Sequence, residues 1–194
     1  MANSRFVFGI GINDADCSVV TLDRGKRLVC HYYRTWRNML MRCYYKPYQD
    51  VQPSYKGCTV CEEWKYFSNF KSWMETQDWE GKQLDKDLLI KGNKISSPKT
   101  CVFLSKKLNN FILENPSTRG DLPIGVHLHE YNNKYRAMIR QGTNRARKHL
   151  GLFDTPEEAH KAWLTSKLEQ AKLLAAEQTD PRIADALIKR YENY

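Results

Sequence analysis

The sequence predicts an α+β protein in which an N-terminal part rich in amphipathic helices precedes a C-terminal antiparallel β-sheet backed by a helix. Residues 134–140 alternate apolar side chains with mostly basic ones, the two-residue period of a half-buried strand. Residues 31–46 instead repeat apolar side chains at three- and four-residue spacings, which indicates a helix with one buried face. Residues 113–124, LENPSTRGDLPI, are rich in Pro, Gly, Ser and Thr and are typical of a linker.

The composition favours a polyanionic partner. The 194 residues include 31 Lys and Arg against 22 Asp and Glu, a formal net charge of +9, and the pI is about 9.2. No apolar run reaches the ~18–20 residues of a membrane span, and the first residues lack the apolar core of a secretory signal. We therefore expect a cytoplasmic protein without a membrane partner, whose six cysteines are reduced thiols or metal ligands rather than disulfides.

The C-terminal segment predicts a hairpin followed by a helix. A second strand over residues 147–152 follows the turn Gln-Gly-Thr-Asn at 141–144, where Gly or Asn can take the positive φ of a hairpin. Thr155 is a helix-capping residue with Glu158 three positions later, and Pro156 stands where a missing N–H costs nothing. A last helix follows Pro181 and is expected to pack on the preceding one.

The predicted sheet has one basic face, since residues 131–153 contain six Lys or Arg and no acid. A basic sheet face backed by a helix is typical of nucleic-acid-binding proteins. The segment also resembles the ethylene-response-factor (apetala-type) DNA-binding domain, in the form found in phage and mobile-element endonucleases. The matching blocks are Gly125-Val126, Lys134–Arg140, residues 149–153 and residues 155–159.

That resemblance implies a three-stranded antiparallel sheet that lies in the major groove of double-stranded DNA. Its outward side chains would contact bases and phosphates. Here His and Met stand at several positions that are Arg or Trp in plant members, so the base preference cannot be transferred. The DNA-binding residues predicted on this basis are His127, His129, Lys134, Arg136, Met138, Arg140, Arg147, Lys148 and His149.

In the N-terminal part, we expect a short strand over residues 6–12, a turn at 13–16 and another turn at 22–27. Asp14 and Asp16 are candidate metal ligands, although acids in turns usually accept local backbone hydrogen bonds. A polar loop is predicted at 47–57. A second amphipathic helix is predicted over 58–77, with its aromatic residues forming the N-terminal core.

Residues 84–111 predict the order strand, loop, strand, helix, which is that of a ββα-metal finger. The strands are expected at 88–90 and 101–104, and the short helix carries Asn109. Three motifs of this N-terminal part resemble phage HNH-type homing endonucleases, which often carry the same C-terminal domain. They are residues 33–43 (YRTWRNMLMRC), 57–64 (GCTVCEEW) and 84–101 (LDKDLLIKGNKISSPKTC).

The resemblance implies an HNH-like ββα-metal domain with added helices. In such a site a histidine that follows an aspartate activates water, and a divalent cation, Mg²⁺ or Mn²⁺, stabilises charge at the scissile phosphate. Here Lys86 stands in place of that histidine, and a protonated lysine is a poor general base. The candidate catalytic residues are Asp85, Lys86, Asp87, Asn93 and Asn109; the alternative is a solvated charged turn.

The cysteines allow two interpretations. Cys43, Cys58, Cys61 and Cys101 could form a structural Zn²⁺ site, although a single C-x-x-C pair with two scattered partners is a weak signal. The alternative is that these cysteines are buried free thiols.

These observations predict an HNH-like domain over residues 1–113, a linker at 114–121, an apetala-type DNA-binding domain at 122–178 and a C-terminal helix at 179–194. The predicted function is that of a phage-type, sequence-specific DNA-binding protein acting as an HNH-like homing endonuclease in the host cytoplasm. The alternative is a catalytically inactive DNA-binding or regulatory phage protein. A protein-interaction module would leave the basic sheet face unexplained.

Overall fold

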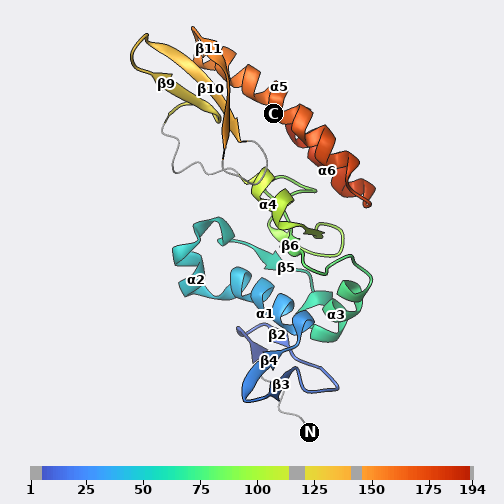
Figure 1. The fold of residues 1–194 in the computed structure, drawn as a ribbon. Coiled ribbons are helices and arrows are strands. Elements are labelled where there is room, and N and C mark those ends of the chain that lie inside the picture. Colours follow the sequence, from blue (N-terminus) through green and yellow to red (C-terminus); the bar gives the residue numbers. More distant parts are fainter. Residues whose placement is uncertain (1–5, 114–120, 141–145, 193–194) are drawn as a thin grey trace. The chain divides into compact units, whose positions relative to one another are not determined.

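The computed structural model describes residues 6–113, 121–140 and 146–192. The chain divides into two compact units, Met1–Ser105 and Lys106–Tyr194 (Figure 1). Both units combine helices with small sheets, so the predicted α+β class is confirmed. The helix at residues 106–112, which the sequence placed with the N-terminal domain, is grouped with the second unit.

The first unit is built from short strands and helices. Its elements in chain order are β1 (Phe6–Val7), β2 (Gly11–Ile12), β3 (Val20–Asp23), β4 (Lys26–Val29), α1 (His31–Tyr44), α2 (Lys46–Val51), the 3₁₀ helix η1 (Pro53–Tyr55), β5 (Thr59–Val60), the 3₁₀ helix η2 (Glu63–Lys65), α3 (Phe67–Glu75), β6 (Gln83–Asp85), β7 (Ile95–Ser96) and β8 (Val102–Leu104).

The apolar stripe of α1 forms the centre of the first core, as its spacing predicts. Trp36 and Leu40 are fully buried, and Met39 and Cys43 are nearly so. The Trp36 indole Nε1 donates a hydrogen bond of 2.7 Å to the backbone carbonyl of Trp64, so the buried polar group of this large ring is satisfied.

Two predictions for the segment after α1 are wrong. The expected loop at 47–57 contains α2 and η1, and the expected helix over 58–77 begins only at Phe67. The reason is a long-range pairing: β5 lies parallel to β7, and the backbone N–H groups of Thr59 and Cys61 donate to the carbonyls of Lys94 and Ser96. Of the aromatic positions predicted for the core, those at Trp64, Phe67 and Phe70 are buried, as expected.

The turn at 13–16 is confirmed for Asn13, whose side chain accepts from the Ala15 N–H at 3.4 Å. The Asp14 carboxylate instead reaches across the unit and accepts from the backbone N–H and the hydroxyl of Ser68, at 2.8 and 2.5 Å. Because Ser68 lies in the first turn of α3, Asp14 satisfies a helix N-terminus.

The predicted strand at 88–90 is also wrong. The first strand of this region is β6, which pairs antiparallel with β8 from Gln83–Leu104 to Asp85–Val102. Asp85 Oδ1 accepts from the N–H groups of Asp87 and Leu88, at 2.9 and 2.7 Å. These contacts turn the chain out of the extended conformation immediately after Asp85.

The second unit is a three-stranded sheet with helices. Its elements are α4 (Lys106–Ile112), β9 (Val126–His129), β10 (Lys134–Arg140), β11 (Arg147–Phe153), α5 (Pro156–Ala176) and α6 (Pro181–Glu192). The strand order is β11-β10-β9, with both pairings antiparallel. The predicted hairpin turn at 141–144 lies outside the described residues.

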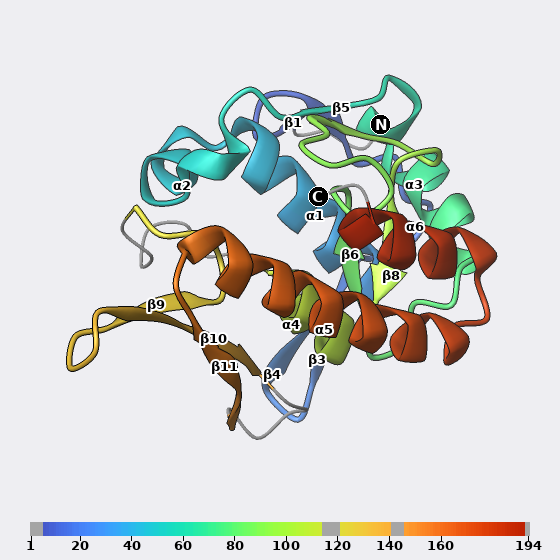
Figure 2. The same ribbon diagram turned by 90° about the horizontal axis from the view of Figure 1, so that it is seen from above.

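One face of this sheet is packed on α5, which runs along it; the chain then turns at residues 177–180 and α6 packs back on α5, as predicted (Figure 2). Ala137 is fully buried with Ala159, and Ile139 is buried with Trp163 and Ala171. The capping box at the start of α5 is confirmed, because Thr155 and Glu158 each accept a backbone N–H of the other, at 3.2 and 3.3 Å.

Helix α4 is held by cations from the two long helices. The Lys167 ammonium donates to the carbonyl of Phe111 at 2.7 Å, and Arg190 donates to that of Ile112 at 3.3 Å. Cations are favourable at a helix C-terminus, where carbonyl groups lack helical partners. Within the part of the chain that the structure describes, no helix is long and apolar enough to cross a membrane.

Candidate nucleic-acid interface

The face of the C-terminal sheet opposite α5 carries the predicted basic residues. Cross-strand neighbours lie on the same face of a sheet, and alternate residues lie on opposite faces. Since Tyr135, Ala137 and Ile139 face α5, the alternate positions of β10 and their partners face away. These outer pairs are Lys134–His129, Arg136–His127, Met138–His149 and Arg140–Arg147.

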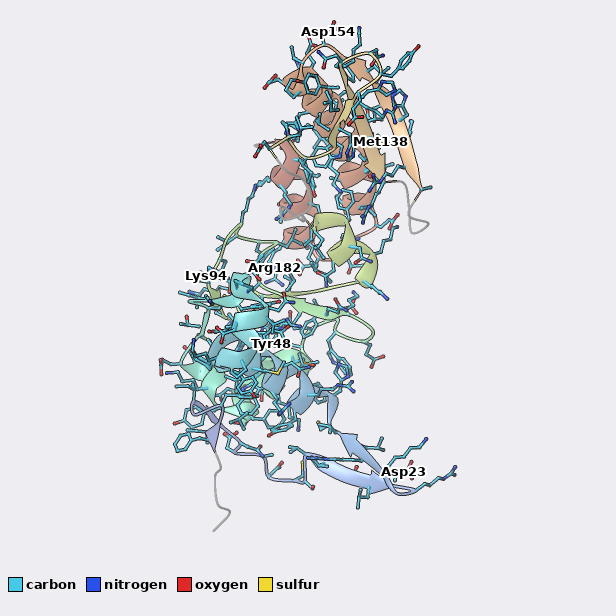
Figure 3. All side chains as sticks on the ribbon, turned by 90° about the vertical axis from the view of Figure 1, so that its left-hand side faces the viewer. Asp23, Tyr48, Lys94, Met138, Asp154 and Arg182 are labelled. Carbon is cyan, nitrogen blue, oxygen red and sulfur yellow. The ribbon has the colours of Figure 1, made fainter. Side chains whose placement is uncertain are left out.

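The register therefore places eight of the nine predicted DNA-binding residues on the outer face, and Figure 3 marks Met138 among them. Lys148 is the exception, because it lies opposite the buried Ile139 and is therefore on the other side of the sheet. The sequence did not indicate Leu152, which pairs with Arg136 and is 39% exposed.

A register shift in β11 explains why Leu152 was missed. Between the pairs Met138–His149 and Ala137–Gly151, β11 contains one extra residue, Leu150. Leu150 and Gly151 consequently both face α5, and Leu150 packs against the buried residues there. Strict alternation fails across such a bulge, and a single strand's sequence does not reveal it.

The outer face holds concentrated positive charge. Arg140 lies directly opposite Arg147, and both are exposed. Among the described residues, the guanidinium groups of Arg136, Arg140 and Arg147 form no ion pair. Lys134 pairs at 3.0 Å with Asp154, which is 80% exposed, so this contact is easily exchanged for another anion.

One histidine of this face, His127, is affected by that charge. Partial burial is the largest cause that lowers the pKa of His127 below its ordinary value, and the charges of Arg147 and Arg136 add to it. His127 is therefore neutral at pH 7. His129 has a different role, since its Nδ1 lies 2.7 Å from Asn132 Oδ1 and supports the turn between β9 and β10.

Close packing behind the sheet fixes the position of β9. Gly125, immediately before β9, has φ +82°, and a Cβ atom there would lie 2.0 Å from Trp163 Cδ1. The Gly125 carbonyl accepts from the N–H of Met138 at 2.9 Å, and His160 Nδ1 lies 2.9 Å from the carbonyl of Ile124. The outer face is thus presented by a rigid support.

The predicted catalytic residues of the first unit form a second polar group, which we call the Lys86 cluster: Asp85, Lys86, Asp87 and Asn93. Lys86 Nζ donates to both carboxylate oxygens of Asp87, at 2.7 and 2.8 Å, and to the carbonyl of Asn93 at 2.7 Å. Only 13% of the Lys86 side chain is exposed.

Asn93 closes the loop that contains this cluster. Its amide nitrogen donates to the carbonyls of Lys86 and Ile95, at 2.9 and 2.7 Å, and its amide oxygen accepts from the N–H of Ile95 at 3.1 Å. Asn93 therefore connects the two ends of the loop between β6 and β7 by hydrogen bonds. These hydrogen bonds are structural.

Protonation states argue against acid–base chemistry by Lys86. Burial is the largest single influence and lowers the pKa of Lys86, but the hydrogen bond and charge of Asp87, together with Cys58 and Tyr55, raise it above its ordinary value. Burial raises the pKa of Asp85, and the N–H groups of Leu88 and Asp87 partly offset this. A lysine held protonated in this way cannot accept a proton from water.

The geometry of the cluster does not fit a divalent cation. The Lys86 ammonium contacts both oxygens of Asp87, and Asp85 Oδ1 already accepts two backbone N–H groups. Among the described residues, no group of three or more His, Cys, Asp or Glu side chains is placed to hold a metal ion. Asn109 lies on α4 in the second unit, whereas the rest of the predicted set lies in the first.

A small cavity of about 40 Å³ borders the cluster, lined by Arg42, Cys43, Tyr55, Asp85 and Cys101 among others. Burial is the main cause that raises the pKa of Cys43 to about 12 and that of Cys101 to about 11. Cys58 is also buried, whereas Cys61 is half-buried and its thiol contacts Glu63. The raised pKa values of Cys43, Cys61 and Cys101 favour the thiol over the thiolate form at these positions.

Comparison of the chain with family models, with curated proteins and with solved structures gave no match. The function must therefore be argued from the residues themselves.

Proposed function

We propose that this protein binds double-stranded DNA through the outer face of its C-terminal sheet, as the resemblance to the ethylene-response-factor domain implies. The observation that carries the proposal is the exposed pair Arg140–Arg147, two like charges directly opposite each other. Like charges at such positions destabilise a sheet. An anionic ligand lying across both strands would remove that cost.

The distribution of charge favours an extended polyanion over a single phosphate. The outer pairs run from Lys134–His129 to Arg140–Arg147, which are six residues apart along β10. At about 3.3 Å per residue this is roughly 20 Å. Since each DNA strand carries a phosphate about every 3.4 Å, the face matches several nucleotides.

The uncharged part of the face supports sequence reading. His127, Met138 and His149 lie between the cations on the same surface. Imidazole nitrogens can donate or accept hydrogen bonds at base edges, and an apolar side chain can contact the methyl group of thymine. Cations would fix the sheet on the phosphates, and these three residues would select the site.

Neighbouring residues of β11 provide the test. Arg147 and Lys148 are both exposed cations, but Arg147 is on the outer face and Lys148 is not. Fluorescence anisotropy with duplex DNA over a range of NaCl concentrations should show that Arg147→Ala weakens binding and reduces the slope of log Kd against log salt by about 0.9. Lys148→Ala should change neither quantity.

Equal losses for the two variants would mean that only net charge matters, and the proposed face would be wrong. Failure of the wild-type protein to bind any duplex, including sites selected from a random library, would refute the proposal as a whole. Wild-type binding that is equally tight for all sequences would leave the phosphate contacts and remove the proposed site selection.

A second candidate function is HNH-like DNA cleavage. Its support is the chain order β6, a loop that contains the two-residue strand β7, β8 and α4, which is similar to that of a ββα-metal fold, together with the cavity beside Asp85. Because the Lys86 cluster does not fit a divalent cation, we derive no cleavage step from it. The alternative to cleavage is a DNA-binding or regulatory role alone.

Nicking of supercoiled plasmid in Mg²⁺ or Mn²⁺ distinguishes these roles. Cleavage that is lost in Asp85→Asn would support the nuclease. The absence of nicking, together with tight specific binding, would leave the regulatory role.

Metal analysis of untreated protein tests the structural Zn²⁺ proposed for Cys43, Cys58, Cys61 and Cys101. A content of less than one zinc per chain would exclude this site.

A further inference from the structure

The β3–β4 hairpin adds nothing to the core of the first unit. All residues from 21 to 28 are exposed, and Leu22 and Leu28 are 77% and 50% exposed. Figure 3 shows the hairpin extending away from the rest of this unit, with Asp23 near its tip. A two-stranded ribbon without a covered face is only marginally stable in water. Packing within the unit therefore does not account for it.

The backbone of this hairpin nevertheless has a regular, well-defined geometry. Arg24 and Gly25 have φ values of +47° and +77°, the two consecutive positive values of a type I′ turn. The register is regular from Asp23–Lys26 to Val20–Val29. The sequence indicated only a turn here, because short strands with exposed polar residues give little periodic signal.

The charges of the hairpin lie on both of its faces. Arg27 is opposite Leu22 on one face, and Lys26 is opposite Asp23 on the other. Arg24 occupies the turn itself. Each face also carries an exposed leucine, Leu22 or Leu28. A ribbon that docked on a protein surface would have one apolar and one polar face. This one carries a leucine and a cation on each face, with the acid Asp23 opposite the cation on one of them.

We propose that the β3–β4 hairpin is a second DNA-binding element, an arm that enters the major groove of the duplex. The inference rests on the proposed DNA-binding function. The major groove admits a two-stranded β-ribbon and is walled by phosphates on both sides. Cations on the two faces and at the tip match those two walls, and the leucines would contact base edges between them.

The test removes the three cations without disturbing the ribbon. Arg24→Asn keeps a residue that readily takes positive φ before Gly25, and Lys26→Thr with Arg27→Thr keeps residues that favour strands. Circular dichroism and thermal unfolding check the fold. A charge-matched control replaces three exposed lysines of α5 and α6, Lys161, Lys172 and Lys189, by glutamine.

The readouts are the salt dependence of binding and protection of guanine N7, a major-groove atom, from methylation by dimethyl sulfate. The probe is a duplex selected from a random library by the wild-type protein. The triple hairpin variant should reduce the slope of log Kd against log salt by about 2–3. In the methylation experiment, the hairpin variant should lose N7 protection at one group of neighbouring guanines. It should keep N7 protection at the separate group of guanines that Arg147→Ala leaves unprotected.

Three outcomes would overturn the inference. An unchanged slope and unchanged protection in the hairpin variant, with Arg147→Ala still weakened, would reject the arm and leave the sheet as the DNA-binding face. A control variant that loses as much as the hairpin variant would assign the effect to net charge. A wild-type protein that binds no duplex would reject the proposed function and, with it, the arm.

Discussion

The Lys86 cluster and the outer face of the C-terminal sheet use charge in opposite ways. In the cluster, the Lys86 ammonium donates to the Asp87 carboxylate and to the Asn93 carbonyl, and only a small part of the side chain meets solvent. On the sheet, Arg140 and Arg147 lie directly opposite each other on neighbouring strands, and both are exposed. One region satisfies its charges internally, and the other leaves them open to a ligand.

This difference separates structural polar groups from binding groups. A charge whose hydrogen bonds are already made within the protein must break them before it can contact a ligand. A charge held beside a like charge gains when an anion arrives. A variant that removes the Lys86 ammonium should therefore lose stability, whereas sheet variants should lose affinity for DNA and keep their stability.

Removing the arginine pair should give the largest effect. The double variant Arg140→Ala with Arg147→Ala should lose about 2–4 kcal/mol of DNA-binding free energy, with the two losses not strictly additive. Its free energy of unfolding should stay level or rise by roughly 0.2–1 kcal/mol, because the cross-strand repulsion is gone. Anisotropy and urea unfolding measure the two quantities. A sheet destabilised by more than about 1 kcal/mol would contradict the comparison.

Lys86→Met should show the reverse behaviour. We expect the free energy of unfolding to fall by about 1.5–3 kcal/mol, because Asp87 and the Asn93 carbonyl lose a charged donor. DNA affinity should change less than about twofold, since Lys86 makes its contacts inside the first unit. Lys99→Met, at an exposed lysine, is the matched control and should stay within about 0.5 kcal/mol. A large loss of affinity without loss of stability would place Lys86 in a binding site.

Asp85→Asn tests the cluster through pH. The pKa of Asp85 is raised above its ordinary 3.8, chiefly by burial, so its contribution to stability is complete at low pH and decreases as pH rises through the folded pKa. An amide oxygen can still accept the N–H groups of Asp87 and Leu88. The variant should therefore equal or exceed the wild type at pH 7 by up to about 1 kcal/mol, and this difference should vanish near pH 4 in urea unfolding. A variant that is less stable at pH 7 would contradict this sign.

Local sequence signals predicted much of the second unit and the face of its sheet. The alternation in β10 and the capping box at Thr155 depend on neighbours a few residues away, and both are confirmed. The α1 stripe was predicted for the same reason. The extra residue at Leu150 was not, because a bulge exists only relative to the partner strand. Because of this bulge, Leu152 lies on the outer face of the sheet.

The first unit was harder to predict because its elements depend on distant partners. β5 exists because it pairs with β7, and the helical period over 58–77 arose from core residues that belong to three different elements. The strand after Lys82 ends where Asp85 bonds to the next backbone N–H groups, a side-chain effect that propensity does not capture. The Lys86 cluster was found by its charged residues, but its internal pairing required the fold.

The smallest effect is expected from His127. Burial and the charges of Arg147 and Arg136 hold the pKa of His127 below its ordinary 6.5. The His127 side chain is therefore mostly neutral at pH 7 in the free protein. Phosphates near Arg136 and Arg147 would offset their charge and raise that pKa, so binding would take up a proton and affinity would rise as pH falls. Between pH 7.5 and 6 we expect a gain of about two- to fivefold in DNA affinity from this residue.

His129 and His149 lie on the same face, so the contribution of His127 is measured as the difference between the wild type and His127→Gln. The variant should bind with a shallower dependence on pH at constant ionic strength. An identical pH profile for the two proteins would mean that no phosphate approaches His127. The DNA would then lie nearer the Arg140–Arg147 end of the sheet.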